Sequence, residues 1–319
     1  MANFYGSYIG YGGGGGTSAE LFQGEFFGYC NGGQQAGNQA YDRIDRFAFP
    51  PGANSSDVGN LATISMYNCS QTDGLSGFLA TANAAYPVNT GIQRYSYASA
   101  TEDAVAHGNL SQGRGSVQGV SGIGTGYGYV CGGASPHTAL KEKFAFASNV
   151  TASGAGNLSI ARHQGGGVND LTHGYNLSGY NSNESADYTR IDRFAFASDG
   201  DSVNCGDVTV SRGGCDNGSC SDIHGYLAGG YGIGEGYTNV IDKHTFASTV
   251  SASDVGDLSA TNQGNGANSS TDYGYAFGGQ PPATLDTIWK WSYASGTQNG
   301  PDTGYNLSLA RVYVSGSQH

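Results

Sequence analysis

The chain has 319 residues, including 55 Gly and 22 Tyr; only 12% of its residues are charged, and the net charge is −12. It lacks the long runs of Ala, Leu, Glu, Lys and Arg that helices need, whereas Gly with aromatic residues is typical of short strands joined by tight turns. The negative charge argues against nucleic acid as a partner, because phosphate binding needs clustered Lys and Arg. No stretch of 18 apolar residues exists to insert into a membrane.

The chain begins with a Gly-rich segment, residues 1–26, that contains the run Gly13–Gly16. Its first residues lack the basic and apolar regions of a secretory signal, so we expect a protein assembled in the cytoplasm. The rest of the chain, residues 27–319, is predicted to be one domain, because a single repeat fills it.

A repeat of about 49 residues runs through the chain, and three columns define it. The first column is a basic residue followed by aromatic-small-aromatic. It begins at Arg46, Arg94, Lys143, Arg193, Lys243 and Lys290. The second column is Gly followed by Tyr or Phe, usually ending in a Gly doublet, and the third is Asn or Asp followed by Leu or Val. Each column occurs six times, which predicts six structural units.

Each repeat divides into four short strands, which we name a to d. In the fourth repeat, strand a is expected over 164–168, strand c over 191–196 and strand d over 202–208, with strand b in the Gly-Tyr segment. Alternation on strand c places Asp192, Phe194 and Phe196 on one face and mostly small residues on the other. We therefore predict that aromatic residues of this column, such as Phe144, Phe194 and Phe246, are buried between neighbouring sheets.

The repeat resembles the kelch repeat: hydrophobic residues ending in Gly-Gly, a strand with an acidic residue, and a polar turn with Arg. It departs from the usual kelch pattern by lacking the Trp of the fourth strand and by losing the Gly doublet in repeats two and four. The resemblance implies an all-β, six-bladed β-propeller with four-stranded antiparallel blades. We expect a composite N-/C-terminal blade, in which 312–315 pairs beside 27–33; the segment 7–12 is the rival strand.

Most of the basic residues follow the repeat. Ten of the thirteen Lys and Arg fall in two columns, one on strand c and one after strand d, and we expect them to bond carbonyls and acidic residues between blades. His107, His137 and His163 form no cluster by spacing, and we predict no metal site and no cofactor. Cys215 and Cys220 are compatible with either a local disulfide or two free thiols.

The candidate binding residues lie in the connections between strands b and c, which vary while the strands repeat. Tyr, Asn, Ser and Gly dominate these connections and make adaptable binding surfaces. The resemblance to kelch propellers implies that the connections share one face with the turns between strands d and a. The residues that we select there are Tyr41, Tyr86, His137, Tyr180, Asn181, Asn183, Tyr231, Tyr237 and Gln280.

The sequence motif of the repeat also resembles those of repeat proteins of tailed phages. An example is Ile-Asp-Arg-Phe-Ala-Phe-Ala-Ser-Asp-Gly (residues 191–200). This resemblance implies a non-enzymatic virion protein, either a tail or fibre component for host attachment or a capsid decoration. Its partners would be other virion proteins and a glycan or protein of the host surface. The alternatives are a carbohydrate-binding or adhesive propeller on a bacterial surface and, third, an enzyme similar to galactose oxidase.

Overall fold

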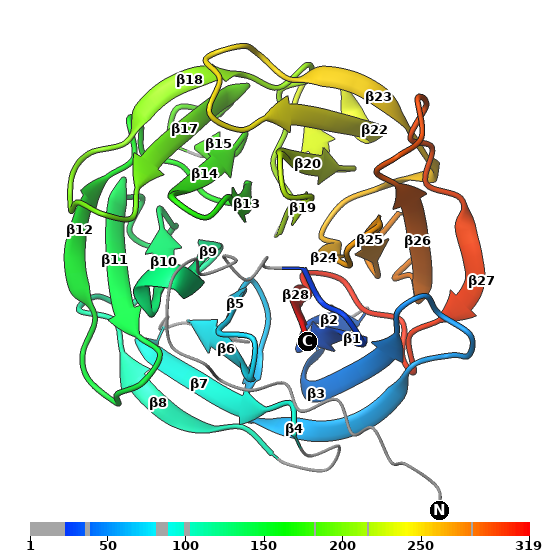
Figure 1. Cartoon of the computed structure of the whole chain (residues 1–319), viewed down its shortest axis with the longest axis horizontal. Helices are drawn as coiled ribbons and strands as arrows, with labels where there is room; N and C mark the ends of the chain where they lie inside the picture. Colours follow the sequence, from blue (N-terminus) through cyan, green and yellow to red (C-terminus); the bar gives the residue numbers. More distant parts are fainter. Residues whose placement is uncertain are drawn as a thin grey trace, which may run out of the picture.

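The computed structural model of the protein describes residues 23–35, 39–80, 89–98, 103–181, 183–215, 217–281 and 283–319. Six antiparallel sheets of four main strands stand around a central axis (Figure 1). Apart from one short 3-10 turn, η1 (Ile123–Thr125), the regular elements in these residues are strands. The predicted six-bladed β-propeller is therefore confirmed.

We number the blades in chain order and keep the letters a to d for the strands from the axis outward. Blade one contains β28 (Ser315–Gln318), β1 (Phe27–Asn31), β3 (Gln39–Ala48) and β4 (Ser56–Ser65). Blade two contains β5 (Cys69–Thr72), β6 (Ser76–Ala80), β7 (Gly91–Ser96) and β8 (Val105–Asn109). Blade three contains β9 (Gln118–Gly122), β10 (Tyr127–Cys131), β11 (Leu140–Ala145) and β12 (Ser153–Asn157).

The second half of the ring repeats this order. Blade four contains β13 (Gly166–Asn169), β14 (His173–Leu177), β17 (Arg190–Ala195) and β18 (Val203–Asp207). Blade five contains β19 (Ser219–Cys220), β20 (His224–Ala228), β22 (Gly236–Thr245) and β23 (Ser253–Asn262). Blade six contains β24 (Gly266–Ser269), β25 (Tyr273–Phe277), β26 (Thr287–Ser292) and β27 (Asp302–Asn306). Short strands also extend three b–c connections: β2 (Gln34–Gln35), β15 (Tyr180–Asn181) with β16 (Ala186–Asp187), and β21 (Tyr231–Gly232).

The C-terminal strand closes the ring, as predicted. β28 pairs antiparallel with β1, from Gly28 opposite Gln318 to Asn31 opposite Ser315. The strand begins three residues later than expected, because Val312 and Tyr313 still belong to the d–a turn: Val312 pairs with Gln34, and Tyr313 has a positive φ of 57°. The rival strand over 7–12 lies outside the described residues. A closed ring leaves no open inner strand to pair with another chain.

Aromatic stacks join every blade to the next. The aromatic ring of each strand b lies on the second strand-c aromatic ring of the following blade, with ring centroids 4.7–5.2 Å apart. The six pairs are Tyr29–Tyr97, Phe78–Phe146, Tyr129–Phe196, Tyr175–Phe246, Tyr226–Tyr293 and Tyr275–Phe49. The prediction that Phe144, Phe194 and Phe246 are buried is confirmed, with exposed fractions of 1%, 5% and 7%.

The Gly of the second column makes room for the strand-c aromatic residue of its own blade. Gly174 pairs with Phe194 across the β14–β17 ladder, and a Cβ atom on Gly174 would lie 2.4 Å from the Phe194 ring. Gly128 and Gly274 are in the same position beneath Phe144 and Trp291. A larger residue there would displace the ring, which explains why the column is Gly in all six repeats.

Four buried ion pairs attach the turns between blades to the following blade. Each Arg after strand d reaches the acidic residue on strand c of the next blade, and all eight residues have exposed fractions of 0%. The pairs are Arg114–Glu142, Arg162–Asp192, Arg212–Asp242 and Arg311–Asp45. The Arg side chains also donate to strand-b carbonyls, as Arg162 does to Asn176, so the expected structural role of this basic column is confirmed.

The two remaining junctions lack both members of the ion pair. Ser65 and Gln93 occupy the two positions between blades one and two, and Asn262 and Trp289 occupy them between blades five and six. The Asn262 amide still donates to the Gly278 carbonyl, and Trp289 Nε1 donates to Ser259. Because a single buried charge is costly whereas replacing the whole pair is tolerated, loss of both partners keeps each junction stable.

Candidate binding site

The b–c connections and the d–a turns share one face of the ring, as the kelch resemblance implied. At five of the six junctions, the residue after the Arg position forms an isolated bridge with the third residue after strand b of the next blade. The bridges are Gly115–Ala134, His163–Tyr180, Gly213–Tyr231, Gln263–Gln280 and Val312–Gln34. Three predicted site residues, Tyr180, Tyr231 and Gln280, therefore lie directly on the scaffold of this face.

A ring of backbone hydrogen bonds holds the six d–a turns together. One residue of each turn has a positive φ of 56–68°: Tyr67, Ser116, Gln164, Gly214, Gly264 and Tyr313. The N–H groups of Ser116, Gln164, Gly264, Tyr313 and Tyr67 each donate to the carbonyl of the preceding turn. Between blades four and five the donor to Gln164 is Cys215 instead of Gly214. A left-handed conformation is uncommon for Tyr and Gln and is stable only where the surroundings impose it.

The Cys215 bond marks a one-residue insertion in the turn between blades four and five. In blade four, Val168 lies opposite Tyr175 and follows Arg162 by six residues; in blade five, Ser219 lies opposite Tyr226 and follows Arg212 by seven. This turn also carries Gly213 and Gly214 where the preceding turn carries His163 and Gln164. The longer chain and the missing side chains leave space at this junction.

A pocket of about 190 Å³ fills that space between blades four and five. It is lined by Gln164, Tyr180, Asp187, Gly213, Gly214, Tyr231, Ile233 and Gln263. Two β-hairpins form its sides: β15–β16, where Tyr180 pairs with Asp187, and β21–β22, where Tyr231 pairs with Tyr237. The two predicted residues Tyr180 and Tyr231 thus come from different blades and meet at one pocket.

A hydrogen bond ties the two hairpins together. The backbone N–H of Ile233 donates to the Asp187 carboxylate. Partial burial raises the pKa of Asp187 above its ordinary value, while the hydrogen bond from Ile233 opposes that shift. Tyr231 and Ile233 remain exposed at the edge of the pocket, with exposed fractions of 39% and 51%. The site therefore combines two aromatic rings, two amides and one carboxylate in a fixed frame.

The preceding junction, between blades three and four, is filled at the corresponding place. The His163 ring lies 5.0 Å from the His137 ring and 5.2 Å from the Tyr180 ring, measured between centroids. The sequence spacing gives no sign of this contact, because the ring brings His137 and His163 together from separate repeats. Burial, with a smaller effect of His137, lowers the pKa of His163 to about 4.

The other predicted residues have structural roles on this face. Tyr237 packs against Tyr231, with ring centroids 5.1 Å apart, and supports the pocket from outside. Asn181 is buried and shapes its hairpin by bonding the Ala161 carbonyl and the Asn183 N–H. Tyr41 donates to Gln35 within the blade-one hairpin, 2.7 Å away. Tyr86 lies outside the described residues.

Of the pocket lining, sequence reasoning selected Tyr180 and Tyr231 only. It missed Asp187 and Ile233 in the b–c connections and Gln164, Gly213, Gly214 and Gln263 in the d–a turns. Our selection considered the b–c connections alone, whereas half of the pocket lining comes from the d–a turns. The signal for the four turn residues was present: they occupy the two positions after the Arg column, which vary between repeats while the column itself is mostly Arg.

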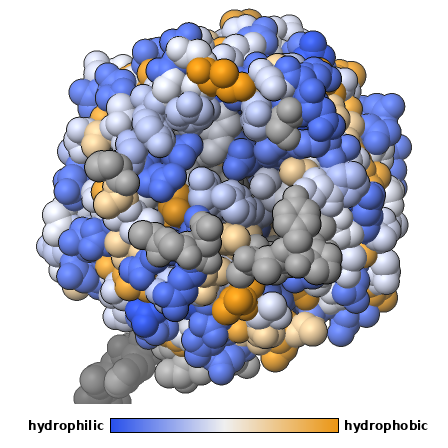
Figure 2. Space-filling model, turned by 180° about the vertical axis from the view of Figure 1, so that it is seen from behind, coloured by the Kyte–Doolittle hydropathy of each residue, from blue (hydrophilic) through white to orange (hydrophobic). Residues whose placement is uncertain are grey.

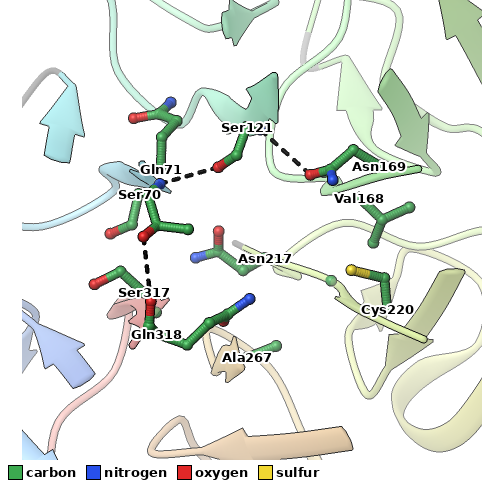
Figure 3. Close-up of a pocket in the computed structure, with 15 residues that line it drawn as sticks. Ser70, Gln71, Ser121, Val168, Asn169, Asn217, Cys220, Ala267, Ser317 and Gln318 are labelled. Atoms are coloured by element: carbon green, nitrogen blue, oxygen red, sulfur yellow. Dashed lines mark hydrogen bonds between the residues drawn. The ribbon is translucent and has the colours of Figure 1, made fainter. Parts of the chain in front are cut away.

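The central channel is narrow and lined by inner strands (Figure 3). Its polar side chains accept hydrogen bonds from the backbone of the inner strands: the Thr72 N–H donates to Ser121 Oγ, and the Ser121 N–H donates to Asn169 Oδ1. Its volume of about 40 Å³ is much smaller than the volume of about 190 Å³ of the pocket between blades four and five. The pocket between blades four and five is therefore the better candidate for a ligand.

All six cysteines are buried, and no disulfide joins Cys215 to Cys220, which decides between the two states left open for this pair. Burial raises the pKa of Cys30 and Cys69 to about 12 and that of Cys131, Cys205 and Cys220 to about 11, so these thiols stay protonated at neutral pH. Among the described residues, no three His, Cys, Asp or Glu side chains lie together as a metal site would need.

Compared with known proteins, the chain matches no protein-family model and no curated protein sequence. Within the part of the chain that the structure describes, no helix is long and apolar enough to cross a membrane.

Proposed function

We propose that this propeller is a non-enzymatic attachment protein of a tailed-phage virion, and that it contacts the host surface with the face formed by the b–c connections and d–a turns. The observation that carries the proposal is the pocket between blades four and five. It lies on the most variable face of an otherwise repetitive ring, and it is built from two rigid hairpins. Binding residues are commonly placed on loops that a rigid scaffold positions.

The repeated side chains support a binding role over a catalytic one. Most Arg, acidic and aromatic residues of the repeat are used in ion pairs and stacks between blades, and the buried thiols are protonated. The virion setting is supported by the resemblance of the repeats to those of phage proteins. The surface in Figure 2 is mostly hydrophilic, and its hydrophobic side chains lie in small separate groups, as suits a reversible contact with a wet cell surface.

A binding assay on cells tests the attachment role. Fluorescently labelled protein is mixed with a panel of bacterial strains, and the bound fraction is measured by flow cytometry. We expect binding to some strains that soluble surface polysaccharide from the same strain abolishes and that protease treatment of the cells leaves intact. No binding to any strain would contradict attachment, and binding abolished by protease would mean that the receptor is a protein.

The virion setting is tested by immunogold electron microscopy with an antibody against the protein. We expect gold particles on the tail or capsid of purified phage from lysed cultures of the source. Labelling of the bacterial surface with unlabelled phage would contradict the virion role and favour the adhesive bacterial propeller.

A further inference from the structure

We infer that the pocket between blades four and five binds one uncharged pyranose ring at the end of a surface glycan, held between Tyr180 and Tyr231. This inference rests on the proposed attachment function and adds the class of ligand and the residues that recognise it. It follows from the size of the pocket, from its walls and from the charges around it.

The size of the pocket fits a single ring. Pockets that enclose drug-sized ligands have volumes of about 300 Å³ or more. At about 190 Å³ this pocket is smaller, but it is much larger than the central channel. It is open to solvent beside Tyr231 and Ile233, so a chain attached to the bound ring could continue away from the protein.

The walls combine aromatic and polar groups in the way that a sugar requires. A pyranose has apolar C–H faces and a rim of hydroxyl groups, and aromatic rings cover apolar faces while keeping a polar edge for hydrogen bonds. Tyr180 and Tyr231 supply the rings. The amides of Gln164 and Gln263 each offer donors and an acceptor, which matches hydroxyl groups that both donate and accept.

The charges favour an uncharged ligand. The Asp187 carboxylate lines the pocket together with no Lys, Arg or His. The same two hairpins carry Glu184 and Glu235, both exposed. A carboxylate or sulfate on the ligand would be repelled here, whereas a hydroxyl group could donate to Asp187.

The frame of the site is set before any ligand arrives. The Asp187–Ile233 hydrogen bond spans the two hairpins, His163 packs against the outer side of Tyr180, and Tyr237 packs against Tyr231. Gln164 is held by its backbone bond to Ser116. A preorganised site loses less conformational freedom on binding, which raises its affinity for a small ligand.

The test is a titration followed by NMR on the isotope-labelled protein. The probes are the methyl glycosides of glucose, galactose, mannose and N-acetylglucosamine, with N-acetylneuraminic acid as the charged member. We expect at least one neutral glycoside to shift the backbone N–H signals of Gly213 and Gly214 in a saturable manner. We expect N-acetylneuraminic acid to shift neither signal.

Variants separate ring stacking from loss of folding. Tyr231→Ala should weaken the titration about tenfold, whereas Tyr231→Phe should keep it, because the ring remains. Tyr305→Ala, on the outer strand β27 of blade six, is the matched control and should bind as the unaltered protein does. The inference is overturned if no neutral glycoside shifts these Gly signals, if only the charged sugar does so, or if Tyr231→Ala binds normally. Because cell binding is measured separately, the attachment function could survive that result.

Discussion

The junction between blades three and four and the junction between blades four and five share a scaffold but differ in what occupies their outer end. Both have a buried Arg–Asp pair, an aromatic stack and a bridge between a d–a turn and the next b–c connection. At the first junction His163 packs between His137 and Tyr180. At the second, Gly213 and Gly214 leave the space open, and the pocket forms.

The two junctions show how a repeat protein can acquire one specific site through a few changes in a turn. The charged and aromatic columns cannot change singly, because each side chain has a partner in the next blade. The two residues after the Arg position take part in neither the ion pair nor the aromatic stack, so a change there leaves both in place. One inserted residue and two glycines are enough to turn a filled junction into a pocket.

The largest effect should come from breaking the shared scaffold at either junction. Asp192→Ala and Asp242→Ala each leave a buried Arg without its acidic partner, and each should lower the free energy of unfolding by about 3–5 kcal/mol. Urea denaturation measures both values. If both junctions depend on their buried Arg–Asp pair, the two variants should lose similar amounts of unfolding free energy. A loss under about 1 kcal/mol in one variant would mean that its junction does not depend on the pair.

The second effect is a pH dependence at the filled junction. The pKa of His163 is lowered to about 4, whereas an unfolded His titrates near its ordinary value of about 6.5. The unfolded state therefore takes up the proton first, and the free energy of unfolding falls as the pH drops from about 6.5 to 4, by about 3 kcal/mol in total. His163→Phe should remove this part of the acid sensitivity.

Denaturation at several pH values between neutral and about 4 checks this prediction. His244, whose pKa burial also lowers to about 4, stays in the variant and accounts for a remaining slope. An unchanged slope in His163→Phe would show that the His163 ring is not buried as described.

The third effect comes from filling the pocket. The double substitution Gly213→His and Gly214→Gln copies the sequence of the filled junction. A Cβ atom at Gly213 would lie 3.0 Å from the Tyr180 Cβ, so we expect a cost of about 1–3 kcal/mol in stability from overpacking. The glycoside titration should disappear. Gly234→Ala, which places its Cβ in open space on the same face, is the control, and normal binding by the filled variant would refute the site.

The smallest effect concerns the bond between the two hairpins. Asp187→Ala removes the acceptor of the Ile233 N–H and should lower stability by about 1 kcal/mol. Glycoside affinity should fall several-fold, because the two walls are no longer held at a fixed separation. Asp187→Asn keeps an oxygen at this position and should retain most of the stability, which denaturation curves of the two variants would reveal side by side.

The sequence predicted the scaffold well, because the scaffold repeats. Six copies of Gly opposite an aromatic residue, and four copies of Arg before an acidic strand, define the blades without further information. The C-terminal strand was predicted to begin at Val312 but begins at Ser315, because Val312 and Tyr313 are residue types that favour strands. The positive φ of Tyr313 is imposed by its hydrogen bonds to the neighbouring turns, which a single repeat does not show.

The pocket was predicted only in part. Tyr180 and Tyr231 were selected as Tyr residues of variable connections, but nothing in a single repeat shows that residues 51 positions apart face one another. Gln164 lies in the turn between blades three and four, and Gln263 lies in the turn between blades five and six, yet both line the same pocket. These residues come together because the closed ring is curved, and the sequence pattern of a single repeat contains no information about that curvature.

The most direct test of the central claim is an experimental structure of the protein with a bound neutral glycoside from the titration. Our account predicts a sugar ring between Tyr180 and Tyr231, beside Gly213 and Gly214, with hydroxyl groups in reach of Gln164, Gln263 or Asp187. A glycoside seated instead at another b–c connection or in the central channel, with this pocket empty, would contradict it.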